Sequence, residues 1–127
     1  MIYAASPYSS PDKDIQHSRY LETERIVAKL IVEYGAYFIS PIVHCHMMAV
    51  RHGMPTDAKW WQRYNENLMS RGTSVVFLLI EGWETSKGMK MEYEFAIKKG
   101  IDIMCYTEER GMVFHSDELE TVFGDKS

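Results

Sequence analysis

The stretch SVVFLLI, residues 74–80, decides the fold of this chain. It is apolar at every position after its serine, so it lacks the alternation of apolar and polar residues that marks a strand with one wet face. Strands that are buried on both faces are typical of parallel sheets, because the connecting helices cover each side. The stretch therefore predicts a central strand with helices on both faces of its sheet.

Three other apolar runs predict further strands. Residues 2–5 (IYAA) form a short run that ends at a loop rich in serine and proline. Residues 36–40 (AYFIS) are rich in β-branched and aromatic side chains, and so are residues 101–107 (IDIMCYT). Together with the central stretch, these runs predict four strands.

The segments between the predicted strands have the periodicity of amphipathic helices. Amphipathic helices are predicted over about residues 14–34, 58–71 and 87–99, because apolar side chains recur there at three- and four-residue spacing and each segment stops at a glycine. Residues 116–123 (SDELETVF) predict a short terminal helix. The segment HCHMMAVRHGMPTD, residues 44–57, is interpreted as a loop with at most one helical turn.

The alternation of strands and helices predicts the fold class. It indicates an α/β protein of one domain, residues 1–127, built as a three-layer sandwich around a mainly parallel sheet of four or five strands, similar to the flavodoxin and Rossmann folds. Ligands bind such folds at the carboxyl ends of strands, where the strand order reverses. The site is therefore predicted in the loops at residues 6–13, 41–55 and 81–87.

Composition and charge argue against some classes of binding partner. The chain is 46% hydrophobic and 25% charged, as in globular proteins, and no run approaches the length of a membrane span. Its net charge of -4 argues against nucleic acid or an anionic membrane as a partner, because both require a basic surface. The early first strand leaves no room for a signal peptide, so we expect a cytoplasmic protein in which Cys45 and Cys105 are reduced thiols.

The segment SKGMKMEYEFA, residues 86–96, carries the candidate chemistry. Ser86 is expected to cap the third helix, whose first N–H groups and dipole favour an anion. Gly88 leaves space for a ligand, and Glu92 shares its face of the helix, whereas Glu94 is expected to point to solvent. A phosphate site beside a carboxylate is one interpretation. A simple helix cap and a solvated acid are the other.

The spacing of Ser86, Gly88, Glu92 and Ala96 resembles the signature of the nucleoside 2-deoxyribosyltransferase superfamily, which includes the nucleoside 5′-monophosphate N-glycosidases. The resemblance extends over roughly residues 2–105 and is similar to a phage and bacterial branch of that superfamily. Three segments carry it in the expected order: IYAASPY (2–8), FISPIVHCH (38–46) and EGWETSKGMKMEYEFA (81–96).

The resemblance implies an enzyme in which Glu92 attacks the anomeric carbon of a (deoxy)ribose. The base leaves, and water or a second base resolves the covalent glycosyl-enzyme. Tyr3 matches a tyrosine that hydrogen-bonds this glutamate. Ser86 stands where nucleoside-specific relatives carry an aspartate, which would repel a phosphate dianion, so a nucleoside 5′-monophosphate is the implied substrate. No metal or organic cofactor is implied, and a homodimer or higher homo-oligomer is expected.

Two departures from the pattern keep other functions open. Glu94 stands where many members carry a glycine. The aspartate that assists the departing base cannot be aligned uniquely with Asn65, Glu66 or Asn67, and of these only Glu66 would preserve a general acid. The chain can therefore also be interpreted as a catalytically weak nucleotide-binding or sensing module, or as an NAD-cleaving glycohydrolase.

The histidines after the second strand allow two interpretations. On an extended segment His44 and His46 would lie on one side, but no further ligand follows at a spacing typical of zinc. We therefore predict no metal site, and the resemblance implies that one or both histidines line a pocket for the base.

Arg19 resembles a phosphate-contacting arginine, with an exposed surface arginine as the alternative. Trp60, Trp61 and Trp83 are candidates for stacking on a base, and one of the adjacent pair is expected in the core. The predicted catalytic residues are Glu92, Tyr3 and Glu66; the predicted substrate contacts are Ser6, Tyr8, Arg19, His44, His46, Asn65, Trp83, Ser86 and Gly88.

Overall fold

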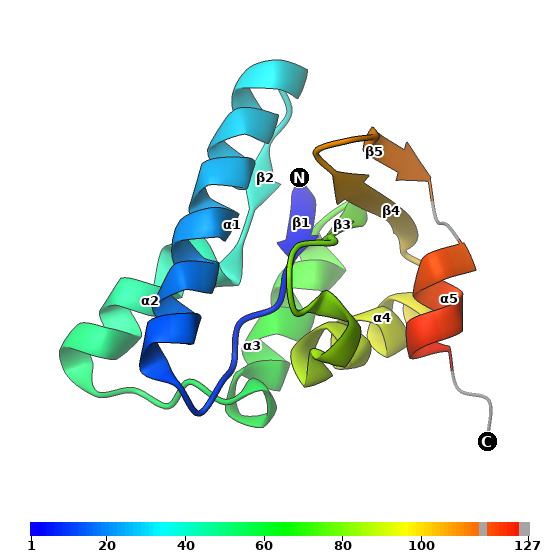
Figure 1. The fold of residues 1–127 in the computed structure, drawn as a ribbon. Helices are drawn as coiled ribbons and strands as arrows, with labels where there is room; N and C mark the ends of the chain where they lie inside the picture. Colours follow the sequence, from blue (N-terminus) through cyan, green and yellow to red (C-terminus); the bar gives the residue numbers. More distant parts are fainter. Residues whose placement is uncertain (115–116, 125–127) are drawn as a thin grey trace.

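The computed structural model describes residues 1–114 and 117–124 and shows one α/β domain around a five-stranded sheet (Figure 1). The strand order is β2-β1-β3-β4-β5. The first four strands pair in parallel, and β5 pairs antiparallel with β4. The strands are β1 (Ile2–Ala5), β2 (Phe38–Ile39), β3 (Ser74–Leu78), β4 (Asp102–Thr107) and β5 (Gly111–Phe114).

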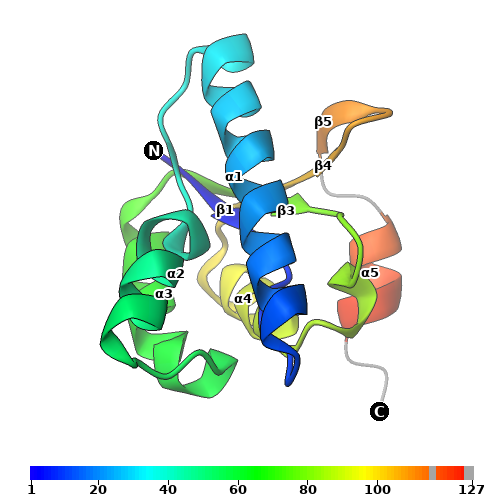
Figure 2. The ribbon, with the colours of Figure 1, turned by 60° about the vertical axis from the view of Figure 1, so that its left-hand side comes forward.

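Helices cover both faces of the sheet, which gives the predicted three layers (Figures 1 and 2). The long helix α1 packs on one face, and α3, α4 and α5 pack on the other. A short 3₁₀ turn, Trp83–Thr85, leads into α4. The helices are α1 (Lys13–Tyr34), α2 (Pro41–His52), α3 (Ala58–Arg71), α4 (Lys87–Lys99) and α5 (Asp117–Phe123).

Strand β3 divides its side chains between the two cores, as the apolar stretch predicts. Val75 and Phe77 belong to the cluster beneath α3 and α4, while Val76 and Leu78 belong to the cluster beneath α1. All four are fully buried. The prediction of a central strand is confirmed, and β3 pairs with β1 on one side and β4 on the other.

The loop predicted over residues 44–57 is wrong over most of its length, because α2 occupies Pro41–His52. Ser40 caps this helix by accepting a hydrogen bond from the backbone N–H of Val43. The proline stands at the first helical position, where its fixed φ suits a helix, and Gly53 ends the helix with a φ of 63°. The start and stop signals are thus present at both ends.

The remaining differences lie at the sheet edges. The second strand shrinks from residues 36–40 to two residues, and β5 was not predicted as a separate element. The predicted terminal helix is present as α5, and Ser116 lies outside the described residues. Within residues 1–114 and 117–124, none of the helices combines the length and the apolar character that a bilayer crossing requires.

The strand order reverses between β1 and β3. From β1 the chain passes through α1 to β2 on one side, and later returns to β3 on the other side of β1. The loops that leave β1 and β3 therefore diverge to opposite faces of the sheet and leave a crevice at the carboxyl ends of these strands. The site was predicted at this edge of the sheet.

Candidate active site

A cavity of about 570 Å³ opens at the reversal of the strand order. Its wall combines the end of β1 and the loop after it, α1, α2, α3, and the turn that leads from β3 into α4. Eight predicted site residues contribute to it: Ser6, Tyr8, Arg19, His46, Asn65, Ser86, Gly88 and Glu92.

Glu92 places a buried carboxylate in the cavity wall. Its side chain comes from the face of α4 that packs toward the sheet, and the residue is 8% exposed. Tyr3, fully buried on β1, donates a hydrogen bond to Oε2 of Glu92, as the resemblance predicts. Burial raises the pKa of Glu92 to about 8, against the opposing effect of that hydrogen bond. Glu94, by contrast, is exposed and pairs with Lys90, as predicted.

The N-terminus of α4 lies beside this carboxylate. Ser86 caps the helix by accepting a hydrogen bond of 3.1 Å from the N–H of Met89, as predicted. Ser86, Lys87 and Gly88 all line the cavity. A Cβ at Gly88 would meet the Cβ of Ala58 at 3.4 Å, so the glycine leaves the space over the helix end open to a ligand.

Arg19 adds a second positive charge to the cavity wall. Its guanidinium donates a hydrogen bond of 2.9 Å to the carbonyl oxygen of Ser9, which anchors it to the loop after β1. It also lies against Gly82, where an added Cβ would come within 2.6 Å of Nη2. Gly82 has a φ of 94°, a conformation that favours glycine, and a Cβ there would displace the guanidinium of Arg19.

Two further hydrogen-bonded groups form the wall near α1 and α2. Tyr8 Oη lies 2.7 Å from Nδ1 of His46, and Nε2 of His46 lies 3.1 Å from Nδ1 of His17. Ser6 is buried and accepts a hydrogen bond of 3.1 Å from the hydroxyl of Thr23. Tyr8 and His46 are therefore held by neighbours before any ligand binds.

The candidate general acids on α3 are less well placed. Glu66 does not line the main cavity; its Oε2 accepts a hydrogen bond from Gln62 beside a small adjoining cavity of about 20 Å³. Asn65 lines both cavities, and its buried Oδ1 has no hydrogen-bond partner within the described residues. An acceptor in this state is expected to take a donor from a ligand.

The structure corrects two predicted substrate contacts. His44 is exposed and does not line the cavity, because on a helix positions two apart lie on nearly opposite sides. The assumption of an extended segment at this site is therefore wrong. Trp83 is buried and packs edge-on against Phe123 in the core instead of facing the cavity. Trp60 and Trp61 both lie outside the core clusters, so the expectation that one would join them is also wrong.

Several cavity residues were not predicted from the sequence. Lys87 directly follows the predicted cap, so its charge beside an anion site was a usable signal. Trp61, a predicted stacking candidate, and the predicted contact Asn65 are four residues apart on one face of α3, and both line the cavity. Gln16 has no such signal: its amide donates to the carbonyl oxygen of Ser10 and to the hydroxyl of Thr56 across the loops.

Metal-ligating side chains do not gather at this site. Among residues 1–114 and 117–124, no three His, Cys, Asp or Glu side chains lie close enough together to hold an ion. Cys45 and Cys105 are both buried, and no disulfide joins them, as expected. The chemistry of the cavity is therefore best described by its acids Glu92 and Asp57, its hydroxyls, its two cations and its histidine.

The comparison with known proteins identifies a family without naming an activity. No curated protein matches the chain. The model of a family described as Domain of unknown function (DUF1937) matches residues 1–108, which include β1 to β4 and every residue that lines the cavity. The resemblance to the deoxyribosyltransferases stays a prediction. Since the match extends over most of its length, the chain belongs to the DUF1937 family.

Proposed function

We propose that this protein cleaves the N-glycosidic bond of a (deoxy)nucleoside 5′-monophosphate, by hydrolysis or base exchange, through a covalent glycosyl ester on Glu92. One observation carries the proposal: a buried carboxylate and an open helix N-terminus share one cavity wall. Ser86 and Glu92 are six residues apart, which is about 9 Å along a helix. That length suits a ligand with its phosphate at one end and its anomeric carbon at the other.

The phosphate end of the proposed ligand is supported by three features. The first N–H groups of α4 point out of the helix, and the dipole there favours negative charge. Lys87 and the anchored Arg19 add two cations to the same cavity. Ser86 brings a hydroxyl instead of a carboxylate, which would repel a phosphate dianion.

The reactive end is supported by the environment of Glu92. A carboxylate beside the anomeric carbon stabilises an oxocarbenium-like transition state and can form the ester. The hydrogen bond from Tyr3 favours the ionised form, while burial opposes it and raises the pKa to about 8. The developing positive charge on the sugar then favours the carboxylate at the moment of reaction.

A nucleotide-binding module without turnover is the second candidate, and the position of Glu66 favours it. In this interpretation the cavity holds a nucleotide, but no carboxylic acid on α3 reaches the base through the main cavity. An NAD-cleaving activity would use the same Glu92 beneath a ribose.

Release of free base separates these functions. The protein is incubated with nucleosides, nucleoside 5′-monophosphates and NAD, and products are separated by chromatography. We expect base from monophosphates alone, and none from Glu92→Ala. Glu94→Ala is the matched control, because Glu94 lies on the solvent face of the same helix. A rise in melting temperature with monophosphates but without product would favour the binding module, and nicotinamide release would favour NAD cleavage.

A further inference from the structure

A chain of three side chains leads from the cavity to the surface of α1. Tyr8 Oη contacts Nδ1 of His46 at 2.7 Å, and Nε2 of His46 contacts Nδ1 of His17 at 3.1 Å. Tyr8 and His46 line the cavity, and His46 is 3% exposed. His17 is exposed to solvent. The chain thus connects a ligand in the cavity with bulk water.

Of these three side chains, only Tyr8 keeps a hydrogen-bonding group for a ligand in the cavity. Both ring nitrogens of His46 are used, one by Tyr8 and one by His17. The hydroxyl of Tyr8 can both donate and accept, so it keeps one hydrogen bond for the cavity. When it accepts from His46 it donates to the ligand, and when it donates to His46 it accepts from the ligand.

The surroundings hold the rings in place. Tyr20 stacks on His46 with ring centroids 4.4 Å apart and an interplanar angle of 26°, and Tyr8 meets the same ring edge-on at 5.4 Å. Burial, and then the charge of His17, lower the pKa of His46. A neutral imidazole donates at one nitrogen and accepts at the other, so it can pass a proton in either direction.

The other titratable groups named around these three side chains come from two elements, α1 and α2. Cys45 precedes His46 on α2, and burial followed by the charge of this thiol raises the pKa of Tyr8. Tyr20 on α1 is hydrogen-bonded to Glu24. Arg19 donates to the backbone carbonyl of Tyr8 at 3.4 Å. Tyr8 therefore keeps its proton at neutral pH until a reacting partner takes it.

We propose that Tyr8 is the acid and base group that works with Glu92, and that His46 and His17 act as relay residues that return and remove its proton. The inference rests on the proposed function. It supplies the acid that Glu66 does not bring to the main cavity. In retaining glycosidases one group serves both halves of the reaction, which a reversible chain of this kind allows.

In the first half, a carboxylate oxygen of Glu92 bonds to the anomeric carbon while the bond from that carbon to the base nitrogen breaks. The electron pair leaves with the base, which takes the proton of Tyr8 Oη. Tyr8 recovers a proton from Nδ1 of His46. His46 then takes a proton at Nε2 from Nδ1 of His17, and His17 takes a proton from water.

In the second half, a water oxygen bonds to the anomeric carbon and the ester bond to Glu92 breaks, so that the electron pair returns to the carboxylate. The water proton passes to Tyr8 Oη, while the phenolic proton moves to Nδ1 of His46. The proton on Nε2 of His46 moves to His17 and leaves to solvent. The chain then has its starting number of protons.

Tyr8→Phe tests the acid role by its dependence on the leaving group. It keeps the ring but removes the proton. We expect kcat/KM to fall by about 10²–10⁴-fold for the best substrate of the panel. With 7-methylguanosine 5′-monophosphate, whose base leaves without a proton, the loss is expected to stay below about tenfold. An equal loss with both substrates, or no loss with either, would overturn the assignment.

His17→Asn tests the relay, because asparagine can hydrogen-bond Nε2 of His46 but does not titrate. We expect a loss of about tenfold or more for the best substrate that imidazole in the buffer restores, since position 17 is open to solvent. His44→Asn on the outer side of α2 is the matched control and should retain full activity. A variant at position 17 with wild-type activity would overturn the relay.

Nitrogen NMR of the imidazoles tests the chain without turnover. We expect the ring-nitrogen resonances of His46 to shift in both His17→Asn and Tyr8→Phe. Resonances of His46 that are unchanged in either variant would overturn the hydrogen-bonded chain, whatever the activity. If the wild type releases no base while both shifts are present, the proposed function and the catalytic assignment of Tyr8 fail, whereas the hydrogen-bonded chain stands.

Discussion

At the scale of single residues, the decisive feature is the protonation of Glu92. The carboxyl is buried, and of the contacts described above only Tyr3 donates to it. Burial disfavours the charged form, and one donor compensates only in part. The site therefore holds an acid that must be ionised to attack, and it stays partly protonated at neutral pH.

This protonation predicts the pH dependence of catalysis. Attack requires the carboxylate, and the pKa of Glu92 is raised to about 8. We expect kcat/KM, which reports the free enzyme, to rise with pH and to level off above about pH 8. Initial rates of base release in overlapping buffers measure this. A profile that is already flat from about pH 5 upward would show that ionisation of Glu92 does not limit the reaction.

The same shift predicts how stability depends on pH. Between the ordinary pKa of 4.5 and the raised value of about 8, the folded chain binds more protons at Glu92 than the unfolded chain. The protonated acid makes its full contribution to folding stability below pH 4.5. This contribution is lost as the pH rises through about 8. Glu92→Gln keeps an acceptor for Tyr3 and cannot ionise, so it should be more stable than the wild type above about pH 8.

Thermal unfolding over this range checks the stability prediction. The melting temperature of the wild type should fall more steeply than that of Glu92→Gln as pH rises from about 6 to 9. Parallel curves for the two proteins would mean that the buried carboxyl does not titrate there. The control Glu94→Gln removes an exposed carboxylate and should follow the wild type.

Gly88 gives a second prediction at this scale. In Gly88→Ala the new methyl group would meet Ala58 at 3.4 Å and the hydroxyl of Ser86 at 4.0 Å, so the fold should tolerate it. The methyl group would stand beside the proposed phosphate site, and we expect KM for the nucleotide to rise by about tenfold, which corresponds to about 1.4 kcal/mol. Steady-state kinetics and a melting curve measure the two effects. Unchanged KM would place the phosphate elsewhere.

Single residues also show what the sequence could reveal about the site. Ser86 was found because helix capping follows local rules. Glu92 was found because it lies four residues after Gly88 on one helical face and matches the resemblance, and Tyr3 was found through the resemblance. His44 and Trp83 were misplaced, because their direction depends on whether the segment is a helix and on which side the core lies. Contacts between distant loops, such as those of Gln16, have no local signal.

At the scale of elements, the N-terminus of α4 is the proposed binding site of the phosphate. The helix begins inside the cavity wall and ends with Gly100 in the left-handed conformation, so its dipole points its positive end at the ligand. Helix α2 approaches the same cavity from the other loop with Pro41, Cys45 and His46. The site is thus shaped by helix ends and faces more than by the loops that sequence rules assigned to it.

The cap of α4 yields a paired prediction. Ser86→Ala and Ser40→Ala each remove a capping hydroxyl and should each cost about 1 kcal/mol of folding stability. Only Ser86 lines the cavity, so only its loss should also weaken binding of nucleoside monophosphates. Chemical denaturation and calorimetric titration separate the two effects. Equal weakening by both substitutions would show that binding depends on stability alone.

Elements differ in how well local rules predict them. The helices at Lys13–Tyr34, Ala58–Arg71 and Lys87–Lys99 were predicted within one residue, because each combines apolar periodicity with a glycine stop. Helix α2 was missed because its mixed histidines, methionines and one proline obscured the period. Strand β5 was missed because its antiparallel pairing with β4 depends on a tertiary contact at the sheet edge.

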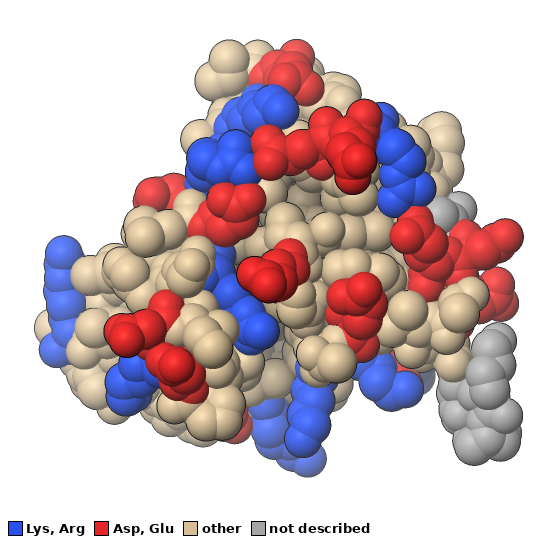
Figure 3. Space-filling model, viewed as in Figure 1, with Lys and Arg blue, Asp and Glu red and all other residues tan. Residues whose placement is uncertain are grey.

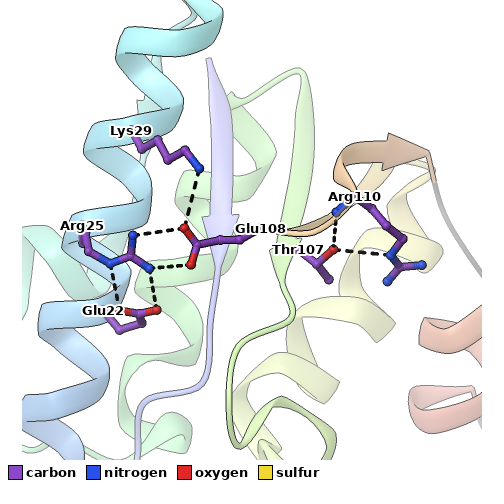
Figure 4. A network of polar contacts seen from close by, with 6 residues as sticks. All are labelled: Glu22, Arg25, Lys29, Thr107, Glu108 and Arg110. Atoms are coloured by element: carbon purple, nitrogen blue, oxygen red, sulfur yellow. Dashed lines mark hydrogen bonds and ion pairs between the residues drawn. The ribbon is translucent and has the colours of Figure 1, made fainter.

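At the scale of the whole molecule, the face drawn in Figure 3 carries charges of both signs. Lys and Arg side chains are interspersed with Asp and Glu side chains over the face in Figure 3. One cluster joins α1 to the turn after β4: Arg25 contacts Glu108 at 2.7 Å and Glu22 at 2.8 Å, and Lys29 contacts Glu108 at 3.6 Å (Figure 4). Arg25 and Glu108 are 83 residues apart in sequence, so the cluster links distant parts of the chain.

Glu108→Gln tests this cluster. The substitution removes the charge that Arg25 and Lys29 share, but leaves an amide that can still accept a hydrogen bond. We expect a small fall in melting temperature at low salt that disappears at about 1 M salt, because exposed ion pairs are weak and screened. Glu109→Gln in the same turn is the control for net charge. A fall that persists in high salt would indicate lost packing instead.

The proposed assembly belongs to this scale as well. The resemblance implies a homodimer or a higher homo-oligomer, and we expect sedimentation analysis to show a species larger than the monomer mass of 14.8 kDa. A single species at the monomer mass across the concentrations used for kinetics would contradict this expectation. The cavity itself is built from one chain, so base release by a monomer would be compatible with the proposed chemistry.

The most direct test of the central claim is mass spectrometry of the protein quenched during turnover of a nucleoside 5′-monophosphate. The proposed mechanism predicts an added mass equal to that of a (deoxy)ribose 5-phosphate unit, located by peptide mapping on Glu92 and absent in Glu92→Gln. An analogue with fluorine at C2′ should increase its amount by slowing the second step. Base release that continues in Glu92→Gln, with no adduct on the wild type, would contradict the account.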